Sequence, residues 1–252
     1  MKIMKTTNFK MKTICAMIIG ILAITGCSKD NSVEPNTPGS AEYMISEAWV
    51  DGKLQHSRTY DNKNRLKSVT MYEDDKVIST SEYHYNEKGL LVQTVIGPNN
   101  VSIINMEYDA SDRPLKGTTI IDGKVVQNQN FTYPKNQTVI TSVAVEGGTI
   151  IQTHSYDADG NVIEILTETG LFKVKSEFGD FDDKQPFDIL YGHENQKHNP
   201  RYEKETWSTG EVTESIYEYK YNDAGYIIES SKINKKTNTL IEKVVYKLIK
   251  KN

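Results

Sequence analysis

The sequence is almost free of cysteine: its 252 residues include two, Cys15 and Cys27. Cys15 lies in an apolar N-terminal run that processing would remove. The remaining chain then holds Cys27 alone, so no disulfide can form within it. Its stability must come from packing and hydrogen bonds, and nothing after Cys27 can act as a cysteine nucleophile.

Motifs that carry chemistry are lacking as well. The chain has no G-x-S-x-G nucleophile elbow and no glycine-rich phosphate loop. The nearest metal motif is His193-Glu194 followed by His198, and on a helix its two imidazoles would lie about 140° apart. A solvated loop accounts better for this stretch. We therefore predict a protein that is not an enzyme and holds neither a cofactor nor a metal.

Two acidic stretches resemble calcium sites without completing one. Asp157-Ala158-Asp159-Gly160 has the start of a calcium loop but not its later ligands. Asp180, Asp182 and Asp183 form the densest acidic cluster, where a turn with solvated carboxylates is favoured over a calcium site.

Long apolar runs are confined to the N-terminus. Met1–Gly26 combines four lysines with the apolar segment Thr13–Thr25, which is too short to span a bilayer. Ile24-Thr25-Gly26-Cys27 resembles a bacterial lipobox, which implies lipidation of Cys27; a plain secretory signal with an incidental cysteine is the alternative. Ser28-Lys29-Asp30 resembles a surface-export signal. These resemblances imply an outer-membrane lipoprotein exposed at the cell surface, with a periplasm-facing one as the alternative.

The segment after Cys27 is polar and contains Pro35, Pro38 and Gly39. It cannot bury a core and reads as a tether that reaches roughly 50 Å. We expect a signal peptide at 1–26, the lipidated cysteine and tether at 27–42, and a single domain at 43–252.

The charge is negative, with a net value of −4 for the whole chain. Because Met1–Gly26 carries lysines and no acids, the remainder is more acidic still. An acidic surface argues against nucleic acid and against electrostatic binding to anionic lipid.

What the sequence does have is a repeat. Tyr156-Asp157-Ala158-Asp159-Gly160 recurs with variations, each copy beginning at a tyrosine that we call an anchor. The first five anchors are separated by 25, 23, 25 and 23 residues, and a gap of 65 precedes the last. A near-constant period of this length indicates a repeat architecture. The anchors are Tyr60, Tyr85, Tyr108, Tyr133, Tyr156 and Tyr221.

Each copy predicts a strand end, a tight turn and a strand start. The tyrosine packs across the strand, Asp or Asn accepts backbone N–H bonds, and Gly tolerates positive φ. A second turn, such as Asp122-Gly123-Lys124, lies midway between anchors, so each period holds two strands. The pattern predicts roughly sixteen strands. We expect an all-β antiparallel meander of repeated hairpins, curved into a half-barrel or open barrel whose exposed edges could accept a partner strand.

The Y-D-x-x-G-x-L spacing resembles the YD repeats of Rhs-type proteins. The chain from residue 27 more closely resembles lipoproteins of unknown function from the Bacteroidetes, which implies a porin-like open β-meander. Phe181-Asp182-Asp183-Lys184-Gln185-Pro186-Phe187 is similar to a Y-D-D-K-x-N-P-F signature of that group. Phe181 would then be a further anchor, with an insertion between it and Tyr221.

For function, we predict a non-enzymatic, monomeric surface lipoprotein that binds a glycan or protein ligand. Tyr191, Tyr202 and Trp207 are the aromatic residues that the repeat does not explain, and they are the predicted ligand-binding group. The alternative is an envelope carrier of an apolar ligand in the concave face. A glycan-active hydrolase, with two carboxylates about 5–9 Å apart, is the third hypothesis.

Overall fold

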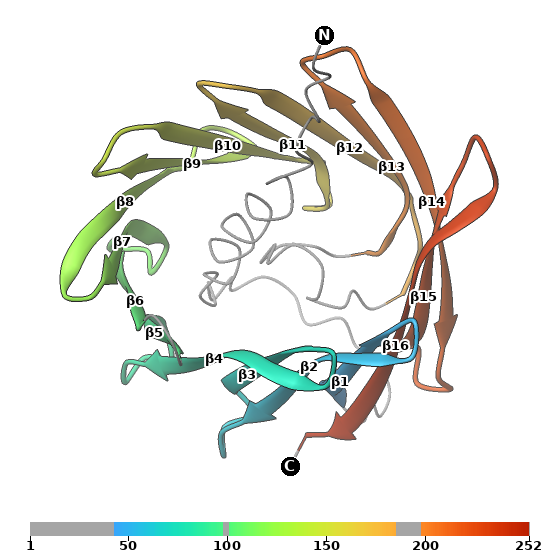
Figure 1. The fold of residues 1–252 in the computed structure, drawn as a ribbon, viewed down its shortest axis with the longest axis horizontal. Helices are drawn as coiled ribbons and strands as arrows, with labels where there is room; N and C mark the ends of the chain where they lie inside the picture. The colour runs from blue at the N-terminus through green and yellow to red at the C-terminus, as the bar shows by residue number, and fades with distance from the viewer. Residues whose placement is uncertain (1–42, 98–100, 185–197, 252) are drawn as a thin grey trace, which may run out of the picture.

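The protein is a barrel of sixteen β-strands, seen in a computed structural model that describes residues 43–97, 101–184 and 198–251 (Figure 1). The predicted signal peptide, Cys27 and the tether lie outside the described residues. No helix within them is long and apolar enough to cross a membrane. The strands are β1 (Tyr43–Val50), β2 (Lys53–Tyr60), β3 (Leu66–Glu73), β4 (Lys76–Tyr85), β5 (Leu91–Gly97), β6 (Ser102–Tyr108), β7 (Pro114–Ile121), β8 (Lys124–Thr132), β9 (Gln137–Ala144), β10 (Thr149–Tyr156), β11 (Val162–Thr169), β12 (Lys173–Phe181), β13 (Pro200–Trp207), β14 (Val212–Tyr221), β15 (Ile227–Asn234) and β16 (Thr239–Lys250).

Every strand pairs antiparallel with the strands before and after it in the chain. The predicted all-β meander is therefore confirmed. The predicted open or half-barrel is wrong, because β1 also pairs with β16, from Tyr43 opposite Lys250 to Val50 opposite Val244. Closure leaves no sheet edge among these strands, so edge-on addition of a partner strand has no basis.

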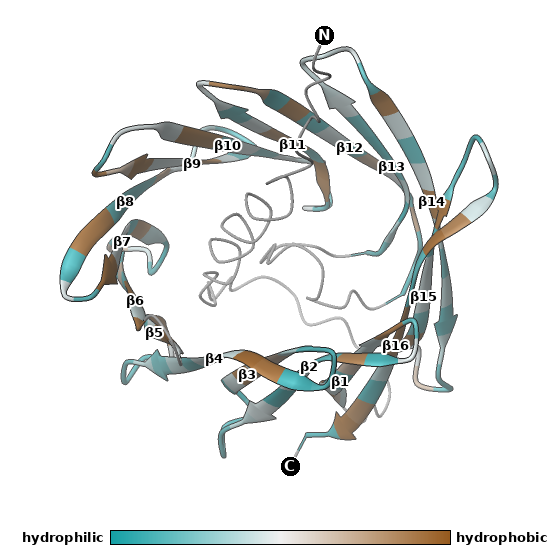
Figure 2. Cartoon of the chain, viewed as in Figure 1, coloured by the Kyte–Doolittle hydropathy of each residue, from teal (hydrophilic) through white to brown (hydrophobic). Residues whose placement is uncertain are grey.

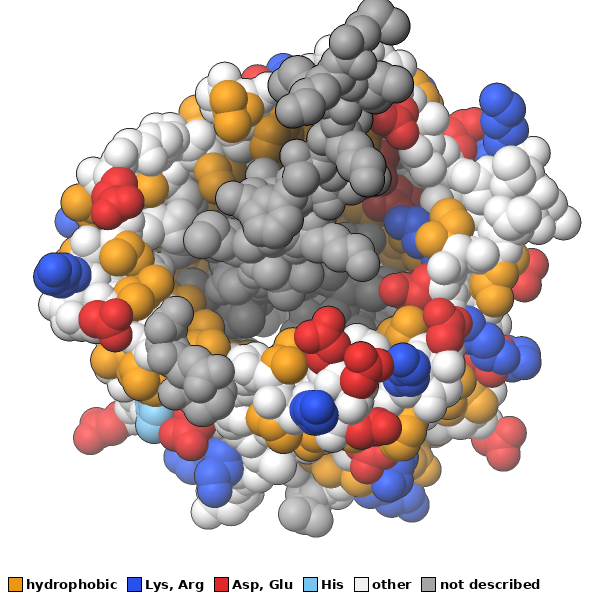
Figure 3. All heavy atoms as spheres, in the orientation of Figure 1, with side chains coloured by type: hydrophobic (Ala, Val, Ile, Leu, Met, Phe, Trp, Pro, Cys, Tyr) orange, Lys and Arg blue, Asp and Glu red, His pale blue; other side chains and the backbone are white. Residues whose placement is uncertain are grey.

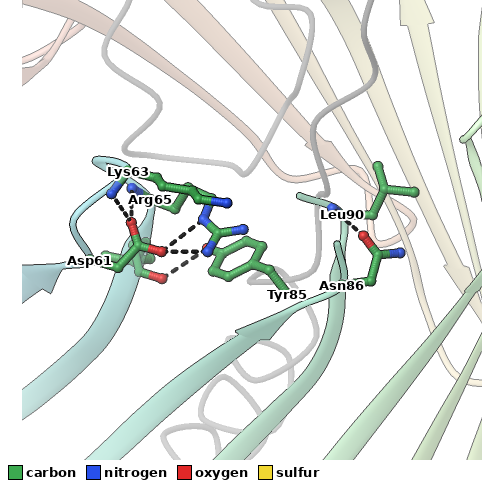
Figure 4. A network of polar contacts seen from close by, with 7 residues as sticks. Asp61, Lys63, Arg65, Tyr85, Asn86 and Leu90 are labelled. Carbon is green, nitrogen blue, oxygen red and sulfur yellow. Dashed lines mark hydrogen bonds and ion pairs between the residues drawn. The ribbon is translucent and has the colours of Figure 1, made fainter. Parts of the chain in front are cut away.

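The turns that follow the even-numbered strands are here called anchor turns, and those that begin with Asp or Asn share one hydrogen-bond pattern. The turn after β8 has Pro134 in that place, and there the backbone N–H of Gln137 donates to the Pro134 carbonyl at 3.0 Å. In the turn after β2, the Asp61 carboxylate accepts bonds from the backbone N–H of Lys63 (2.8 Å) and Arg65 (2.9 Å) (Figure 4). Asn64 takes the positive φ of 60° that closes the turn. The Arg65 guanidinium returns to Asp61 and lies 4.5 Å above the ring of Tyr85, the next anchor. Equivalent bonds are made by Asn86, Asp109, Asp157 and Asn222.

The anchor tyrosines tie neighbouring strands together. The Tyr85 hydroxyl, at the end of β4, donates to the carbonyl of Leu66 at the start of β3, at 2.8 Å. Each such bond fixes the height of one strand against the next at the same end of the barrel. The equivalent bonds run from Tyr60 to Ile45, from Tyr108 to Leu91 and from Tyr133 to Pro114.

Turns after the odd-numbered strands are shorter. Asp51 and Gly52 both have positive φ, at 49° and 80°, and so do Asp122 and Gly123, at 50° and 74°. Two consecutive positive φ values are the signature of the type I′ turn, whose twist matches that of a hairpin. The predicted two-strand repeat is confirmed here.

The strands have an inner and an outer face, which Figure 2 shows as alternating hydropathy along each arrow. Side chains on the same face as the anchors are far more buried: Ile104 and Met106 are 4% and 6% exposed, whereas Glu107 between Met106 and Tyr108 is exposed. On a closed barrel such crowding occurs on the concave side. We call this face the inner wall. Its apolar core has two clusters, Leu91 with Ile104, Met106 and Phe131, and Ile45 with Ala48, Ile227, Val244 and Tyr246.

The ion pairs of the outer wall lie on one half of the barrel. Lys175 pairs with Glu177 along β12 (3.0 Å), and Lys220 pairs with Glu229 across β14 and β15 (2.8 Å). In Figure 3, Lys, Arg, Asp and Glu side chains gather at the lower right of the ring, near β15 and β16. Among the described residues, the ion pairs of β2–β10 lie instead in turns. Further outer-wall pairs are Lys243–Glu229 and Lys247–Glu47.

Phe181 occupies an anchor position, as the sequence predicts. It ends β12 and pairs with Pro200, the first residue of β13. The Asp182 carboxylate accepts from the N–H of Lys184 at 3.0 Å and of Asn199 at 3.1 Å, the same bonds that Asp61 makes. The insertion is therefore confined to one enlarged anchor turn. The Tyr221 hydroxyl also donates to Asp182.

Replacing Tyr108 with Phe tests the anchor bond. The change removes the hydroxyl that donates to Leu91 at 2.7 Å and keeps the ring. We expect the free energy of unfolding to fall by about 1 kcal/mol, measured by urea denaturation. Tyr43→Phe is the control, because the Tyr43 hydroxyl has no hydrogen bond to any described residue while its ring packs on Tyr226. Equal effects of the two changes would contradict a specific role for the anchor hydroxyl.

Candidate ligand-binding site on the inner wall

A polar group interrupts the inner wall on β2. Alternation from the anchor Tyr60 places Arg58 and His56 on the same face, two and four residues before it. His56 is next to Ala48 of β1 and Met71 of β3. An arginine and a histidine thus lie among apolar neighbours on the concave side of the barrel.

Several inner-wall polar atoms are buried without a hydrogen-bond partner among the described residues. They include Nε2 of His56, Nε of Arg58 and Oγ1 of Thr94, whose side chain is 1% exposed. Thr94 pairs with Tyr83 on the neighbouring strand, so it belongs to the same sector, β2–β5. Oε1 of Gln129, on β8, is a further unpaired atom. Buried polar groups are nearly always hydrogen-bonded, and such a cluster is typical of a binding site.

Burial sets the ionisation of these groups. Burial, with a smaller contribution from the nearby charge of Arg58, lowers the pKa of His56 to about 4, so the imidazole is neutral at neutral pH. Burial also raises the pKa of the Tyr83 hydroxyl, while Arg58 and Ser81 oppose that rise. Arg58 is the permanent charge of this sector and acts on both neighbours.

A second polar group lies on the inner wall at β13–β15. Glu203, 4% exposed, forms an ion pair with Lys232 at 2.7 Å and accepts a hydrogen bond from the Tyr217 hydroxyl. Glu205 lies two residues further along the same face. Burial raises the pKa of Glu205, and the Glu203 carboxylate adds to the effect. The two carboxylates therefore have opposite environments, one ion-paired and the other destabilised in its charged form.

The acidic cluster at Asp180–Asp183 is a turn. Both oxygens of Asp182 accept hydrogen bonds from Asn199, and Asp183 forms an ion pair with Lys184 at 3.2 Å. In the part of the chain that the structure describes, no three His, Cys, Asp or Glu side chains are grouped to hold a metal ion. His193 lies outside that part.

The predicted aromatic group is dispersed. Tyr202 lies on the outer wall, where its hydroxyl donates to Glu214 at 2.5 Å and this bond raises its pKa to about 12. Trp207 lies on the opposite face of β13, in line with Glu203, and packs 6.1 Å from Phe172. Tyr191 lies outside the described residues. Binding by these three stays a prediction, and Tyr202 and Trp207 cannot share one ligand surface on a single face.

Comparison with known proteins identifies the family. Residues 45–171, half of the chain, match a family described as "Uncharacterised protein". The chain belongs to this family. No curated protein matches it.

Two solved structures have a similar fold. A porin-like protein from Bacteroides vulgatus ATCC 8482 aligns with a TM-score of 0.55 and 12% identity, over 81% of this chain and 97% of that one. A porin-like protein from Bacteroides uniformis ATCC 8492 aligns with a TM-score of 0.52 and 14% identity, over 81% and 96%. Identity this low shows the fold alone. The porin-like part of the resemblance is thus confirmed, while its YD-repeat and lipoprotein parts stay predictions.

His154, 5% exposed on the inner wall, provides a test by pH. Burial lowers its pKa from 6.5 to about 4, so between these values the unfolded chain binds a proton that the folded chain does not. The contribution of His154 to the free energy of unfolding is therefore complete above pH 6.5 and is lost as the pH drops towards 4. Through His154 we expect the free energy of unfolding to fall by about 2 kcal/mol from pH 7 to pH 5.

Urea denaturation of the wild type and of His154→Gln at both pH values isolates this contribution, because the other titrating groups are common to both. We expect the fall in the variant to be smaller by that amount. The same fall in both proteins would show that His154 is not buried in its neutral form.

Proposed function

We propose that the protein is a non-enzymatic binding protein of the cell envelope that holds an apolar or amphiphilic ligand against the inner wall. The observation that carries this proposal is the inner wall itself: it has aliphatic and aromatic clusters, and the buried Nε2 of His56, Nε of Arg58 and Oγ1 of Thr94 have no hydrogen-bond partner within residues 43–97, 101–184 and 198–251. Sixteen strands enclose an interior wider than the wall's own side chains can fill. This is the carrier alternative of the sequence analysis, now better supported than a glycan- or protein-binding surface.

The ion pairs on one half of the outer wall favour a barrel whose exterior is in contact with water. Glu177 accepts from Lys175 at 3.0 Å, and Glu229 from both Lys220 and Lys243. These groups sit in mid-strand, where a lipid-facing wall needs an apolar band. Transfer of such pairs into hydrocarbon is costly.

Attachment to the envelope would come from outside the barrel. The lipobox-like sequence ending at Cys27 supports an outer-membrane lipoprotein, and the polar segment 27–42 supports a tether that holds the barrel away from the bilayer. Display at the cell surface is the proposed orientation.

Binding of an apolar ligand is tested with the full chain carrying Cys27→Ser, which cannot be acylated, and the uncharged fluorophore N-phenyl-1-naphthylamine. We expect saturable fluorescence enhancement. Ile104→Ser, on the inner wall, should weaken it several-fold, because apolar contact with the probe is lost.

Ile103→Ser is the matched control, since Ile103 is the adjacent residue on the outer wall. Circular dichroism confirms that both variants fold. Non-saturable enhancement, or equal weakening by the two changes, would refute binding at the inner wall.

The pair Glu203 and Glu205 favours a second candidate, a glycan-active hydrolase. Two residues apart on one face of β13, they are separated by about 6.7 Å along the strand, within the range of a glycosidase pair. Glu205, with its raised pKa, would serve as the acid, and Glu203, in its ion pair with Lys232, as the base or nucleophile.

Hydrolysis of a panel of p-nitrophenyl glycosides by the Cys27→Ser chain tests this candidate. If the candidate is right, the chain cleaves at least one glycoside, and Glu205→Gln reduces the rate at least about a hundredfold. The outer-wall change Glu218→Gln should leave the rate unchanged. Failure to cleave any glycoside of the panel rules the candidate out for those substrates, and an active Glu205→Gln chain rules out this residue.

A further inference from the structure

We propose that Arg58 binds the anionic head group of an amphiphilic ligand, a carboxylate at the end of an aliphatic chain. The inference rests on the proposed function and names the class of ligand. It starts from a half-buried arginine on the concave side of the barrel whose Nε is buried and has no hydrogen-bond partner among the described residues. A cation that loses part of its hydration is stabilised when an anion pairs with it.

No carboxylate among residues 43–97, 101–184 and 198–251 forms an ion pair with Arg58. The contrast with Lys232 is direct, since that inner-wall cation is neutralised by Glu203 at 2.7 Å. Glu242 faces the same wall from β16, and it and Arg58 both act on the hydroxyl of Tyr246. No ion pair joins Glu242 to Arg58, so the cation remains available to a ligand.

The neighbours of Arg58 supply further hydrogen bonds suited to a carboxylate. His56 is two residues away on the same face, about 6.7 Å along the strand, and as a neutral imidazole it has one ring N–H to donate. The planar guanidinium can take both oxygens of one carboxylate. Two neighbouring polar groups on β2, with no hydrogen-bond partner for Nε of Arg58 or Nε2 of His56 among the described residues, thus match one small anionic group.

The surroundings fit an aliphatic chain attached to that group. Val69 pairs directly with Arg58, and Met71 pairs with His56. Beyond Thr94 the wall continues into the cluster of Leu91, Ile104, Met106 and Phe131. A head group at Arg58 would therefore leave its chain on apolar side chains. A free inorganic anion would gain nothing from them.

The test uses the Cys27→Ser chain and displacement of N-phenyl-1-naphthylamine by three ligands with one chain: oleate, oleyl phosphate and oleyl alcohol. We expect oleate to displace the probe at a concentration about tenfold or more below that of the alcohol, since a charged hydrogen-bonded pair contributes this much. Arg58→Met should abolish that advantage and leave binding of the alcohol unchanged. Arg58→Lys should keep part of it, because the charge remains without the fork.

Lys116→Met is the matched control, removing an exposed cation of the outer wall, and should leave the preference intact. Stronger binding of oleyl phosphate than of oleate would assign the site to phosphate and overturn the carboxylate. Equal binding of oleate and alcohol, or a preference that survives in Arg58→Met, would overturn the proposal. In either case retained binding of the fluorophore shows that the proposed function stands, whereas loss of saturable fluorophore binding by the parent chain refutes the function itself.

Discussion

The barrel depends on the hydrogen bonds that four anchor tyrosines, Tyr60, Tyr85, Tyr108 and Tyr133, donate to the start of the preceding strand. The hydroxyls of Tyr60, Tyr85 and Tyr108 all reach a backbone carbonyl at 2.7–2.8 Å. A ring that spans its neighbour in this way must lie on one face of the sheet at every repeat. The period of the sequence therefore sets which face becomes the inner wall, and with it which side chains point into the barrel.

Much of this was predictable because it is local. The turn at Asp61 is made by residues four apart, so the local sequence predicts it. The local sequence also predicts the anchor position of Phe181. Closure was not predictable, since pairing of Tyr43 with Lys250 joins opposite ends of the domain and no local pattern reports it. The site was missed for another reason. The signal that locates it is the alternation of β2, which places Arg58 and His56 on the same face as Tyr60.

A closed wall separates two chemical environments that one strand presents in alternation. On β13 Glu203 lies inside, 4% exposed, while Lys204 lies outside near Glu177. Outside, ions pair in water and contribute little individually. Inside, Arg58 forms no ion pair with a carboxylate of the part of the chain that the structure describes.

The enlarged anchor turn has a consequence for how such a barrel can diversify. Asp182 makes across seventeen residues the bonds that Asp61 makes across four, and the strands on either side keep their register. The register of the strands is thus independent of the number of residues between those bonds. Seven turns lie at this rim of the barrel, one after each even-numbered strand from β2 to β14. A segment inserted into such a turn would change the surface at the rim without changing the pairing of the strands.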